Sequence, residues 1–434
     1  MDTSHAGDPL PRPDGLILAP FRALRYDPAR VALADVLAPP YDVIDDAGRS
    51  ALEAREPHNV VRLTLPRDEP GSAPDSGSRY AVANALMAQW RSAGVLRADE
   101  HPALYVYEQR DNGHTQRGVV GGVALTPAED AIVLPHENTM AGPVADRLAL
   151  MVATEADLEM IFLVYDGGGA TGRAVAEVDR DDPLVDVTTA DRVRHRLWAI
   201  TDPELLAEIA DDLHDRRAVI ADGHHRYATY LRYQALRHAD GSGGGPWDFG
   251  LAFLVDGSAF GPQVHAIHRA VPGLTPERAI ELAATGFEVT EVAGGVRASE
   301  DELAKAGLDG SAFVVTDGTR AWLLTKPDPA QLAAALPPER SAAWRALDVA
   351  VAHGFLIRAL WGLDDNEDTV EFHHDVPSAT AAAVAGGGIA LLLNPTPVSD
   401  VAAVAASGER MPRKSTLFVP KPATGLLIRA FADG

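Results

Sequence analysis

Hydrophobic and polar positions along the chain predict helices and strands that are interleaved without a regular alternation. Apolar residues recur at helical spacing from Tyr80 to Trp90, which predicts a helix over 79–95. Two strand-like runs, 103–110 and 117–125, are joined by a connection that begins Asp-Asn-Gly, a sequence typical of a hairpin. The fold class expected from this pattern is mixed α/β with a tendency to α+β.

The same periodicities predict the remaining elements. Before Pro272 we expect a helix at 203–215 and strands at 160–166, 193–200, 217–222, 248–256 and 262–271, the last two forming a pair. After it we expect helices at 275–287 and 341–360, and strands near 287–292, 311–317, 320–325 and 388–394. The length of 434 residues favours more than one domain. The expected organisation is a disordered tail at 1–14, an α+β domain at 15–271 and a C-terminal α/β region at 272–434.

Composition excludes several classes of function. Apolar residues make up 46% of the chain and charged residues 23%, as in globular proteins. The absence of cysteine excludes disulfides, a thiolate nucleophile and cysteine-ligated zinc. A formal net charge of −24 disfavours nucleic acid as a partner, because binding it depends on neutralising phosphates with Lys and Arg. No membrane span or signal peptide is recognisable, so we expect a cytoplasmic protein with no membrane partner.

The stretch AVIADGHHR carries the clearest chemical pattern, a strand that ends at a glycine and leads into a helix. Gly223 allows positive φ or a close approach to a ligand. The helix N-terminus that follows has unpaired N–H groups and a partial positive charge, so it suits an anion. Arg226 can bind a phosphate through two parallel hydrogen bonds, and His224 and His225 can donate hydrogen bonds or titrate. The alternative is a capped helix with a solvent-facing histidine pair.

Three side chains are candidates for proton transfer. Asp222 either caps the helix or accepts a proton from a substrate hydroxyl. His136 and Glu137 follow an apolar run and can act as general acid or base, with a hydrogen-bonded loop as the alternative. Arg147 lies on the helix expected beyond them and is a candidate for binding the phosphate ligand.

Two further stretches contain polar clusters. Lys414, Ser415, Thr416 and Lys421 lie in the basic stretch GERMPRKSTLFVPKPATG, whose Lys-Ser-Thr sequence suits a phosphate. A basic surface loop is the alternative, and the stretch lacks the glycines of a P-loop. In APPYDVI, the Tyr-Asp pair either lines a site or belongs to a rigid turn.

Metal and dinucleotide signatures are weak. The chain has no His-Glu-x-x-His motif, so no metal site made by the protein alone is expected. A divalent cation that accompanies a nucleotide remains compatible with the sequence. The segment GGGATG, at 167–172, fits a G-x-G-x-x-G pattern, but without regular βαβ alternation around it a glycine turn is favoured over a dinucleotide site.

These motifs together resemble a known family. APPYDVI, PHENT with a downstream Asp-Arg pair, ADGHHRYAT, LDVAVAH and MPRKSTLFVPKPATG occur in the order found in the DUF 1015 family of bacterial and archaeal proteins. The resemblance extends from about Pro20 to Arg429. It implies a single family architecture over nearly the whole chain.

The central ADGHHRYAT is also similar to the signature of the ParB/sulfiredoxin superfamily, in which a strand, a turn and a helix N-terminus hold nucleotide phosphates. This second resemblance implies phosphate-holding roles for Gly223, His225 and Arg226, and a place near the reacting group for Asp222. Sulfiredoxin activity is excluded because the chain has no cysteine, and the net charge argues against a DNA-partitioning protein. The free-serine-kinase branch has no such conflict.

The function expected is a phosphotransferase or phosphohydrolase acting on a small phosphorylated metabolite, with serine or phosphoserine as the first candidate and ATP or ADP with Mg²⁺ as cofactor. The helix N-terminus would hold phosphates, Lys414 and Lys421 would neutralise charge, and Glu137, His136 or Asp222 would activate the attacking hydroxyl or water. This site requires distant stretches to converge in one pocket. The alternative is a non-catalytic protein that binds a nucleotide or phosphometabolite and regulates a partner. The sequence does not define the oligomeric state.

Overall fold

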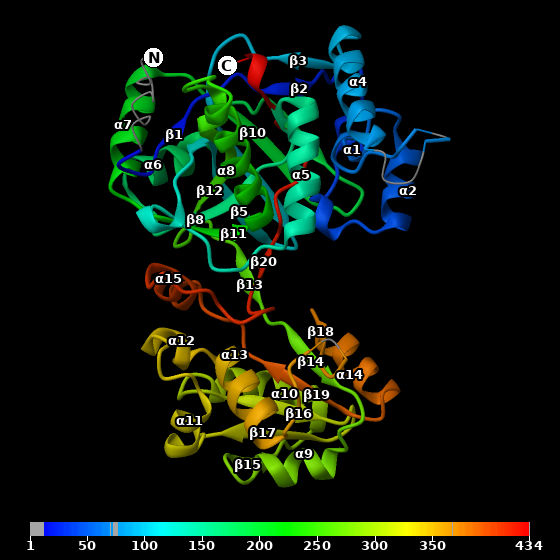
Figure 1. Ribbon diagram of the computed structural model, residues 1–434, viewed down its shortest axis with the longest axis vertical. Coiled ribbons are helices and arrows are strands. Elements are labelled where there is room, and N and C mark those ends of the chain that lie inside the picture. Colours follow the sequence, from blue (N-terminus) through cyan, green and yellow to red (C-terminus); the bar gives the residue numbers. More distant parts are fainter. Residues whose placement is uncertain (1–12, 70, 73–76, 367, 434) are drawn as a thin grey trace, which may run out of the picture. The chain divides into compact units, whose positions relative to one another are not determined.

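The chain forms two compact units in the computed structural model, which describes residues 13–69, 71–72, 77–366 and 368–433. Unit 1 comprises the chain up to Pro262 and again from Pro420 onward, and unit 2 comprises Gln263–Val419 (Figure 1). The predicted domains at 15–271 and 272–434 stay a prediction, and most of the predicted tail at 1–14 lies outside the described residues.

Unit 1 is built on a nine-stranded sheet with the order β6-β11-β8-β12-β5-β4-β10-β9, to which β1 adds by pairing with β5. Its strands are β1 (Leu18–Ala19), β4 (Leu104–Asp111), β5 (His114–Ala124), β6 (Val133–Leu134), β8 (Ile161–Tyr165), β9 (Val185–Thr188), β10 (Arg194–Ile200), β11 (Ala218–Asp222) and β12 (Phe249–Asp256). Two pairs, β11 with β6 and β12 with β8, are parallel, and the others are antiparallel. This mixed sheet with its helices confirms the expected mixed α/β class.

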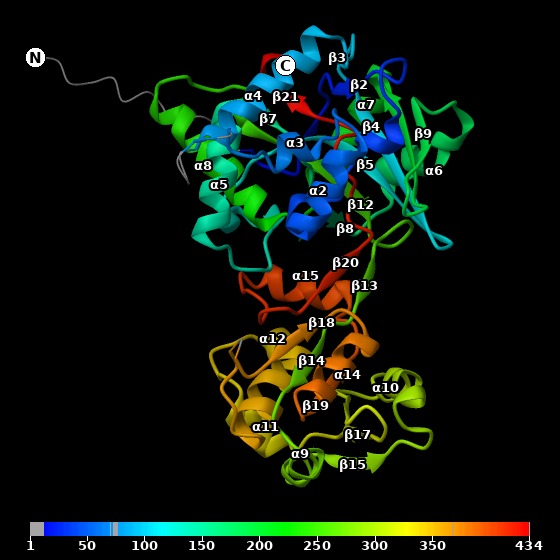
Figure 2. The same ribbon diagram turned by 90° about the vertical axis from the view of Figure 1, so that its right-hand side faces the viewer.

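Helices and two small sheets complete unit 1. The helices are α1 (Leu33–Val36), α2 (Asp46–Arg55), α3 (Val61–Thr64), α4 (Ser78–Ser92), α5 (Ala141–Thr154), α6 (Gly169–Glu177), α7 (Pro203–His214) and α8 (His224–Ala239), with short 3₁₀ turns at Tyr41–Val43, Ala128–Asp130, Val178–Arg180, Pro246–Asp248 and Phe431–Asp433. α5 and α8 lie side by side, as Figures 1 and 2 show. The strand pairs β2 (Leu24–Tyr26) with β3 (Leu96–Ala98), and β7 (Ala156–Asp157) with β21 (Arg429–Ala430), are antiparallel. The second pair ties the C-terminal segment into unit 1.

The hairpin predicted from Asp-Asn-Gly is confirmed by the pairing of β4 with β5. Asn112 and Gly113 both have positive φ, 46° and 85°, as a type I′ turn requires. Asparagine and glycine are among the residues that reach this region at least cost, which is why the sequence signal is reliable here.

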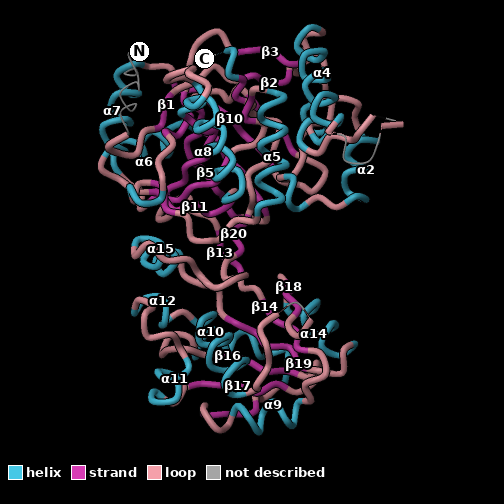
Figure 3. Tube along the Cα trace, viewed as in Figure 1, coloured by secondary structure: helices cyan, strands magenta, loops and turns pink. Residues whose placement is uncertain are grey.

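Unit 2 contains a six-stranded antiparallel sheet with the order β15-β17-β16-β19-β14-β18, and a separate pair of β13 with β20 (Figure 3). The strands are β13 (Gln263–His265), β14 (His268–Val271), β15 (Glu288–Glu291), β16 (Phe313–Thr316), β17 (Ala321–Thr325), β18 (Glu371–His373), β19 (Ile389–Leu393) and β20 (Leu417–Val419). The helices are α9 (Pro276–Ala283), α10 (Ser299–Ala306), α11 (Pro329–Ala335), α12 (Ala342–Ala346), α13 (Asp348–Ala350), α14 (Val376–Ala385) and α15 (Val398–Ala406), with a 3₁₀ turn at Gly295–Ala298 and a π-helix at Val351–Leu360.

Two predictions about elements are wrong. The segments 248–256 and 262–271 do not pair: β12 pairs with β5 and β8, and the second segment divides into β13 and β14 of unit 2. The long helix expected over 341–360 is broken at Leu347, which is buried in an extended conformation between α12 and α13. Tertiary partners decided both cases against the local pattern.

The position of α8 is fixed by a row of tyrosines on its buried face. Tyr227, Tyr230 and Tyr233 belong to the same hydrophobic core as the central strands of the sheet. The Tyr227 hydroxyl donates to the carbonyl oxygen of Thr126 at 2.7 Å, and the Tyr230 hydroxyl donates to that of Glu159 at 2.8 Å. Buried tyrosines need such acceptors, so the helix and its N-terminus are held in one register on the sheet.

Membrane insertion through a helix has no support in the described part of the chain, where no helix combines the necessary length with sufficient apolar character.

Candidate functional site

The turn between β11 and α8 is shaped by Gly223. Its φ is 96°, and a Cβ there would lie 3.1 Å from Cγ2 of Ile161 and equally close to Nε of Arg226. Both the backbone conformation and the available space therefore favour glycine. The N-cap residue of α8 is Gly223, so the alternative in which Asp222 is the cap is wrong.

Arg226 is directed into the protein. It is 5% exposed, and its guanidinium donates hydrogen bonds to the carbonyl oxygen of Met160 and to the carboxylate of Asp222. Burial by itself lowers the pKa of Arg226, but the nearby carboxylates of Asp222 and Glu159 outweigh burial and raise it. Arg226 thus links the turn to the segment that contains Met160. Its role as a phosphate ligand stays a prediction.

Lys421 forms ion pairs with two carboxylates at this turn. Its Nζ lies 2.6 Å from Oδ1 of Asp222 and 2.8 Å from Oδ2 of Asp42. Burial lowers the pKa of Lys421, but the two carboxylates more than offset burial and raise it. Asp42 behaves in the opposite sense: burial raises its pKa, and Lys421 and Arg226 bring it below the ordinary value. The side chains of Asp42, Lys421 and Asp222 are 37%, 18% and 12% exposed, so solvent reaches this cluster.

The use of lysine here is unusual for this chain. The sequence contains four lysines, Lys305, Lys326, Lys414 and Lys421, and the remaining 34 of its 38 basic Lys and Arg residues are arginines. Lys421 is therefore the one lysine in unit 1. The compact ammonium group of lysine can exchange one hydrogen-bonding partner for another, whereas the planar guanidinium of arginine fixes the directions of its hydrogen bonds.

The histidine pair at the start of α8 holds a loop. Nε2 of His224 accepts a hydrogen bond from the backbone N–H of His136 at 3.2 Å, and Nε2 of His225 accepts one from that of Met140 at 3.0 Å. Adjacent residues on a helix point about 100° apart, so the two rings reach the two ends of the same loop. Burial lowers the pKa of His225, which suits an accepting, neutral ring. The alternative of a solvent-facing pair is wrong for His224, which is 6% exposed.

The carboxylate of Glu137 lies near the imidazole rings of His136 and His224. Its Oε1 is 3.9 Å from Nε2 of His136, and its Oε2 is 3.7 Å from Nδ1 of His224. The two rings meet edge to face, with centroids 4.6 Å apart. His136 is fully buried, whereas the Glu137 side chain is 42% exposed. Of the side chains predicted to transfer protons, Glu137 and Asp222 reach solvent, and His136 does not.

Arg147 is buried behind the cluster. Its Nε donates to the carboxylate of Asp146 at 2.9 Å, and its Nη1 donates to the carbonyl oxygen of Thr64. Its guanidinium also lies 4.3 Å from the centre of the Tyr41 ring and 3.8 Å from Glu159. These contacts anchor the segment that carries Asp42, and ligand binding by Arg147 stays a prediction.

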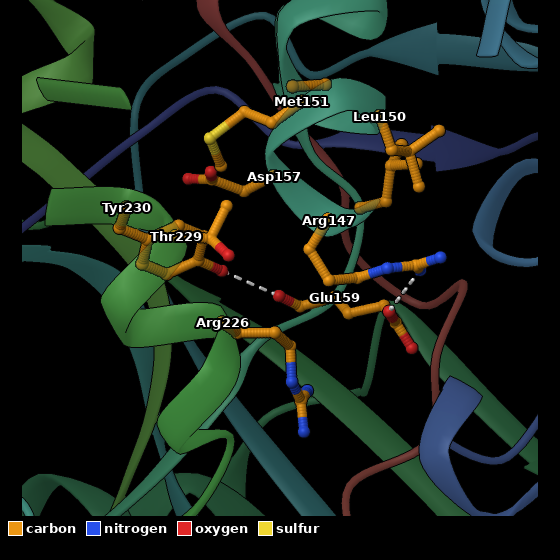
Figure 4. Close-up of a pocket in the computed structure, with 10 residues that line it drawn as sticks. Arg147, Leu150, Met151, Asp157, Glu159, Arg226, Thr229 and Tyr230 are labelled. Atoms are coloured by element: carbon orange, nitrogen blue, oxygen red, sulfur yellow. Dashed lines mark hydrogen bonds and ion pairs between the residues drawn. The ribbon is translucent and has the colours of Figure 1, made fainter. Parts of the chain in front are cut away.

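A small cavity lies between α5, α8 and the segment from Ala156 to Glu159 (Figure 4). About 30 Å³ is accessible to the centre of a water molecule, which is enough for water and too little for a metabolite. Asp157 is one of the residues that line the cavity. Its Oδ2 accepts a hydrogen bond from Arg429 at 2.9 Å, and its Oδ1 is buried without a hydrogen-bonding partner among the described residues. Burial raises the pKa of Asp157 to about 6, although Arg429 opposes the change. The cavity therefore places the buried carboxylate of Asp157 between α5 and α8.

The residues predicted in the Lys-Ser-Thr sequence lie in unit 2, whereas Lys421 lies in unit 1. Ser415 is buried, with its hydroxyl donating to the carbonyl oxygen of Pro412, and Lys414 is exposed. That Lys414, Ser415 and Thr416 share a pocket with Arg226 stays a prediction.

Two weaker motifs can be placed as well. In the segment 167–172, a turn at Gly167 and Gly168 leads into α6, and the N–H of Gly168 donates to the carboxylate of Asp256 at 2.9 Å, so a side chain of the protein occupies the place of an anion. Over the described part of the chain, no group of three or more His, Asp or Glu residues is arranged to hold a metal ion.

Sequence reasoning left Asp42 open and did not find Glu159. Glu159 accepts from the backbone N–H of Tyr41 at 2.9 Å, so it positions the turn that presents Asp42 to Lys421. The Pro-Pro-Tyr-Asp turn was a signal for the first residue. Glu159 carried none, because its role depends on a contact across 118 positions in sequence.

Comparison with known proteins gives the family. The model of a family described as "Protein of unknown function (DUF1015)" matches residues 18–350. The chain belongs to the DUF1015 family. The resemblance seen in the motifs is thereby confirmed. A search of curated proteins finds no match to this DUF1015 chain.

Among solved structures, the DUF1015 chain is similar to a mutant free serine kinase in complex with ADP, at 12% identity, TM-score 0.33, over 68% of this chain and 88% of that one. A conserved hypothetical protein from Pyrococcus furiosus matches at 16% identity, TM-score 0.29, over 66% and 87%. SbnI with a C-terminal truncation, from Staphylococcus aureus, matches at 11% identity, TM-score 0.32, over 71% and 87%. At these values the likeness carries no activity over to the DUF1015 chain.

Proposed function

We propose that unit 1 is a phosphotransferase or phosphohydrolase that acts on a small phosphorylated metabolite, with serine or phosphoserine as the first candidate and the cytoplasm as its location. The observation that carries the proposal is the Lys421 ammonium held between the carboxylates of Asp222 and Asp42 at the N-terminus of α8. Phosphoryl transfer depends on positioning the reacting groups and neutralising their charge. It therefore uses groups of the kind found here, a cation, two solvent-exposed carboxylates and a helix N-terminus.

Phosphate binding follows from the position of Lys421. An incoming phosphate competes with the two carboxylates for the ammonium group and gains the partial positive charge of the α8 N-terminus. Gly223 takes the left-handed conformation that starts α8, and His225 lies in the first turn of the same helix. ATP or ADP with Mg²⁺ is the cofactor that this chemistry suggests, since carboxylates released from Lys421 are suitable magnesium ligands.

Proton transfer falls to the exposed carboxylates. Asp222, Asp42 or Glu137 can accept the proton of the attacking hydroxyl or water, because each reaches solvent. Glu137 is the most exposed of the three, at 42%, and its carboxylate lies 3.9 and 3.7 Å from the imidazoles of His136 and His224. His136, which is fully buried, would act through Glu137.

A second candidate function is a non-catalytic protein that binds a nucleotide or phosphometabolite. The observation in its favour is that Asp222 pairs with both Arg226 and Lys421. A carboxylate between two cations is a poor base, although it can still organise a binding site. The two functions differ in turnover and share the same anion site.

The test is ligand-dependent melting of the full chain with ATP, ADP, pyrophosphate, serine and phosphoserine, with and without magnesium. Wild type, Lys421→Ala and the exposed control Lys305→Ala are compared. Ligand at about 100 times its Kd stabilises the folded state by about 2.7 kcal/mol. We expect a shift with a phosphate compound that is clearly reduced in Lys421→Ala and kept in full in Lys305→Ala.

Turnover then separates the two functions. Glu137→Gln and Asp222→Asn abolish turnover and keep ligand binding in an enzyme, whereas a binding protein has no turnover in wild type. If no phosphate compound shifts the melting of wild type, or if Lys305→Ala loses the shift equally, the site is not a phosphate site and the proposal fails.

A further inference from the structure

Unit 2 contains a buried arginine without a carboxylate partner. Arg269, on β14, is fully buried, and its guanidinium donates to the carbonyl oxygens of Ile267 and Lys414 and to Nε2 of His353. The distances to Lys414 and His353 are 2.9 and 3.1 Å. Among the described residues no carboxylate lies within ion-pair distance of it. A buried charge is costly unless it is paired, so this arrangement leaves positive charge inside the unit.

The histidine beside Arg269 is neutral, and its tautomer follows from its partners. Nε2 of His353 accepts from Arg269, so Nδ1 carries the proton and donates to Asp365 at 2.7 Å. Burial lowers the pKa of His353, in agreement with a neutral ring. His353 lies in the π-helix, a rare conformation that is frequent at functional sites. It is the last residue of LDVAVAH, the one family motif to which no role was assigned.

Among the described residues, the carboxylate that this cluster shares is that of Asp365. The other oxygen of Asp365, Oδ1, binds Nη2 of Arg413 at 2.7 Å. The guanidinium groups of Arg413 and Arg269 both lie over the Phe372 ring, 4.9 and 5.3 Å from its centre. Burial lowers the pKa of Arg269 to about 9, Asp365 opposes this, and the charge of Arg413 adds to it. Two cations at neutral pH thus depend on one carboxylate.

A third cation stands on the same loop. Lys414 follows Arg413, is exposed, and its ammonium has no partner among the residues that the structure describes. Its backbone has a φ of 53°, a conformation unfavourable for a lysine, and the hydrogen bond from Arg269 to its carbonyl oxygen holds it there. The next carbonyl oxygen, of Ser415, accepts from Thr396 at 3.1 Å. The carbonyl groups are used internally, while the two basic side chains reach solvent.

We propose that the Arg413–Lys414 loop of unit 2 is a second oxyanion site, for a phosphate or phosphomonoester group, which works independently of the cluster around Lys421. The fork of Arg413 and the point charge of Lys414 contact the anion. Arg269 does not touch it and acts as a positioning residue, since it fixes the loop and supplies buried positive charge. Asp365 keeps Arg413 in place, and the described residues of the cluster, Arg269, Arg413 and Lys414 against Asp365, carry a surplus of two positive charges, which a phosphate dianion balances.

The test measures binding of inorganic phosphate by isothermal titration calorimetry at constant ionic strength, so that screening is equal throughout. Four full-length proteins are compared: wild type, Arg413→Ala/Lys414→Ala, the unit-1 variant Lys421→Ala, and the control Arg320→Ala/Lys326→Ala. The control removes one arginine and one lysine from exposed ion pairs of unit 2, with side chains 50% and 75% exposed. Acetate serves as the competing carboxylate.

In the expected result, Lys421→Ala still binds phosphate. In Arg413→Ala/Lys414→Ala the affinity of that binding event falls by at least about tenfold, and in the control it stays within about twofold of wild type. The melting temperature verifies that the loop variant is folded. Four results overturn the inference: no unit-2 binding event in Lys421→Ala up to about 10 mM phosphate, an equal loss in the control, acetate binding as tightly as phosphate, or one binding event that both Lys421→Ala and the loop variant abolish. The last result would assign the loop to the site at α8.

Discussion

The two units each bury an arginine beside a loop that carries a family motif, and they neutralise it in opposite ways. Arg226 in unit 1 pairs with Asp222, and Glu159 and Asp42 add to the negative field around it. Arg269 in unit 2 meets two carbonyl oxygens and a neutral histidine. The pKa of Arg226 is raised and that of Arg269 is lowered, although both side chains are buried.

The difference identifies what each arginine does. In unit 1 the ion network is closed around Arg226, and the cation that faces solvent is Lys421. In unit 2 the network is short of negative charge, and Arg413 and Lys414 add to the deficit at the surface. Burial alone therefore does not define the role of an arginine. The partners of its guanidinium decide whether the side chain stabilises the fold or contributes to a site for an anion.

The strongest test of this comparison removes each buried arginine. Arg226→Met leaves Asp222 with one partner fewer and should lower the free energy of unfolding by about 3–5 kcal/mol, as for a broken buried ion pair. Arg269→Met leaves carbonyl oxygens unsatisfied but also removes an unpaired charge, so a loss of about 1–3 kcal/mol is expected. Urea denaturation followed by circular dichroism measures both. Equal losses would show that the two arginines are neutralised alike.

One buried acid in each unit, Asp157 in unit 1 and Asp365 in unit 2, should give opposite dependences of stability on pH. Asp157 has a pKa of about 6 in the folded protein against an ordinary 3.8. Its contribution to stability is complete below about pH 4 and is lost as the pH rises through about 6, a loss of about 3 kcal/mol. The pKa of Asp365 is instead strongly lowered: burial raises it, but hydrogen bonds from His353 and Arg413 outweigh burial. Its contribution is present above about pH 4 and is lost as the pH falls further.

The measurement is stability against pH for Asp157→Asn, Asp365→Asn and the exposed control Asp309→Asn. Asp157→Asn should flatten the decline between about pH 4 and 6, and Asp365→Asn should reduce the loss in acid. Asp309→Asn should follow wild type at every pH. If the Asp157 variant keeps the decline, protonation of Asp157 is not its cause.

The smallest effect concerns two of the backbone positions with positive φ, Gly223 and Lys414. Gly223→Ala should cost about 1–2 kcal/mol from the left-handed backbone, and more if Ile161 cannot give way. Lys414→Gly should be neutral or stabilise by up to about 1 kcal/mol, while still weakening phosphate binding. Thermal melting and phosphate titration of the same samples measure the two properties. Loss of stability in Lys414→Gly would contradict the strain assigned to this loop.

Local structure was largely readable from the chain. The Asp-Asn-Gly hairpin and the strand–glycine–helix of ADGHHR are decided by neighbouring residues, since few residues tolerate positive φ and apolar periodicity selects the element. The helix over 341–360 was not, because Leu347 is buried in an extended conformation that no local signal announces. The histidine pair was recognised as important, but its use as two clamps on the loop at 136–140 requires the loop to be present.

The sequence alone determined the mixed α/β class, the family and the motifs in which polar side chains gather. Only the tertiary structure decided which of these side chains meet: Lys421 reaches Asp42 across 379 positions, and Arg269 reaches Lys414 across 145. Backbone preferences act over a few residues, whereas the pairing of buried charges depends on which strands and turns the hydrophobic core brings together. That is why the groups of both sites were visible in the sequence and their partners were not.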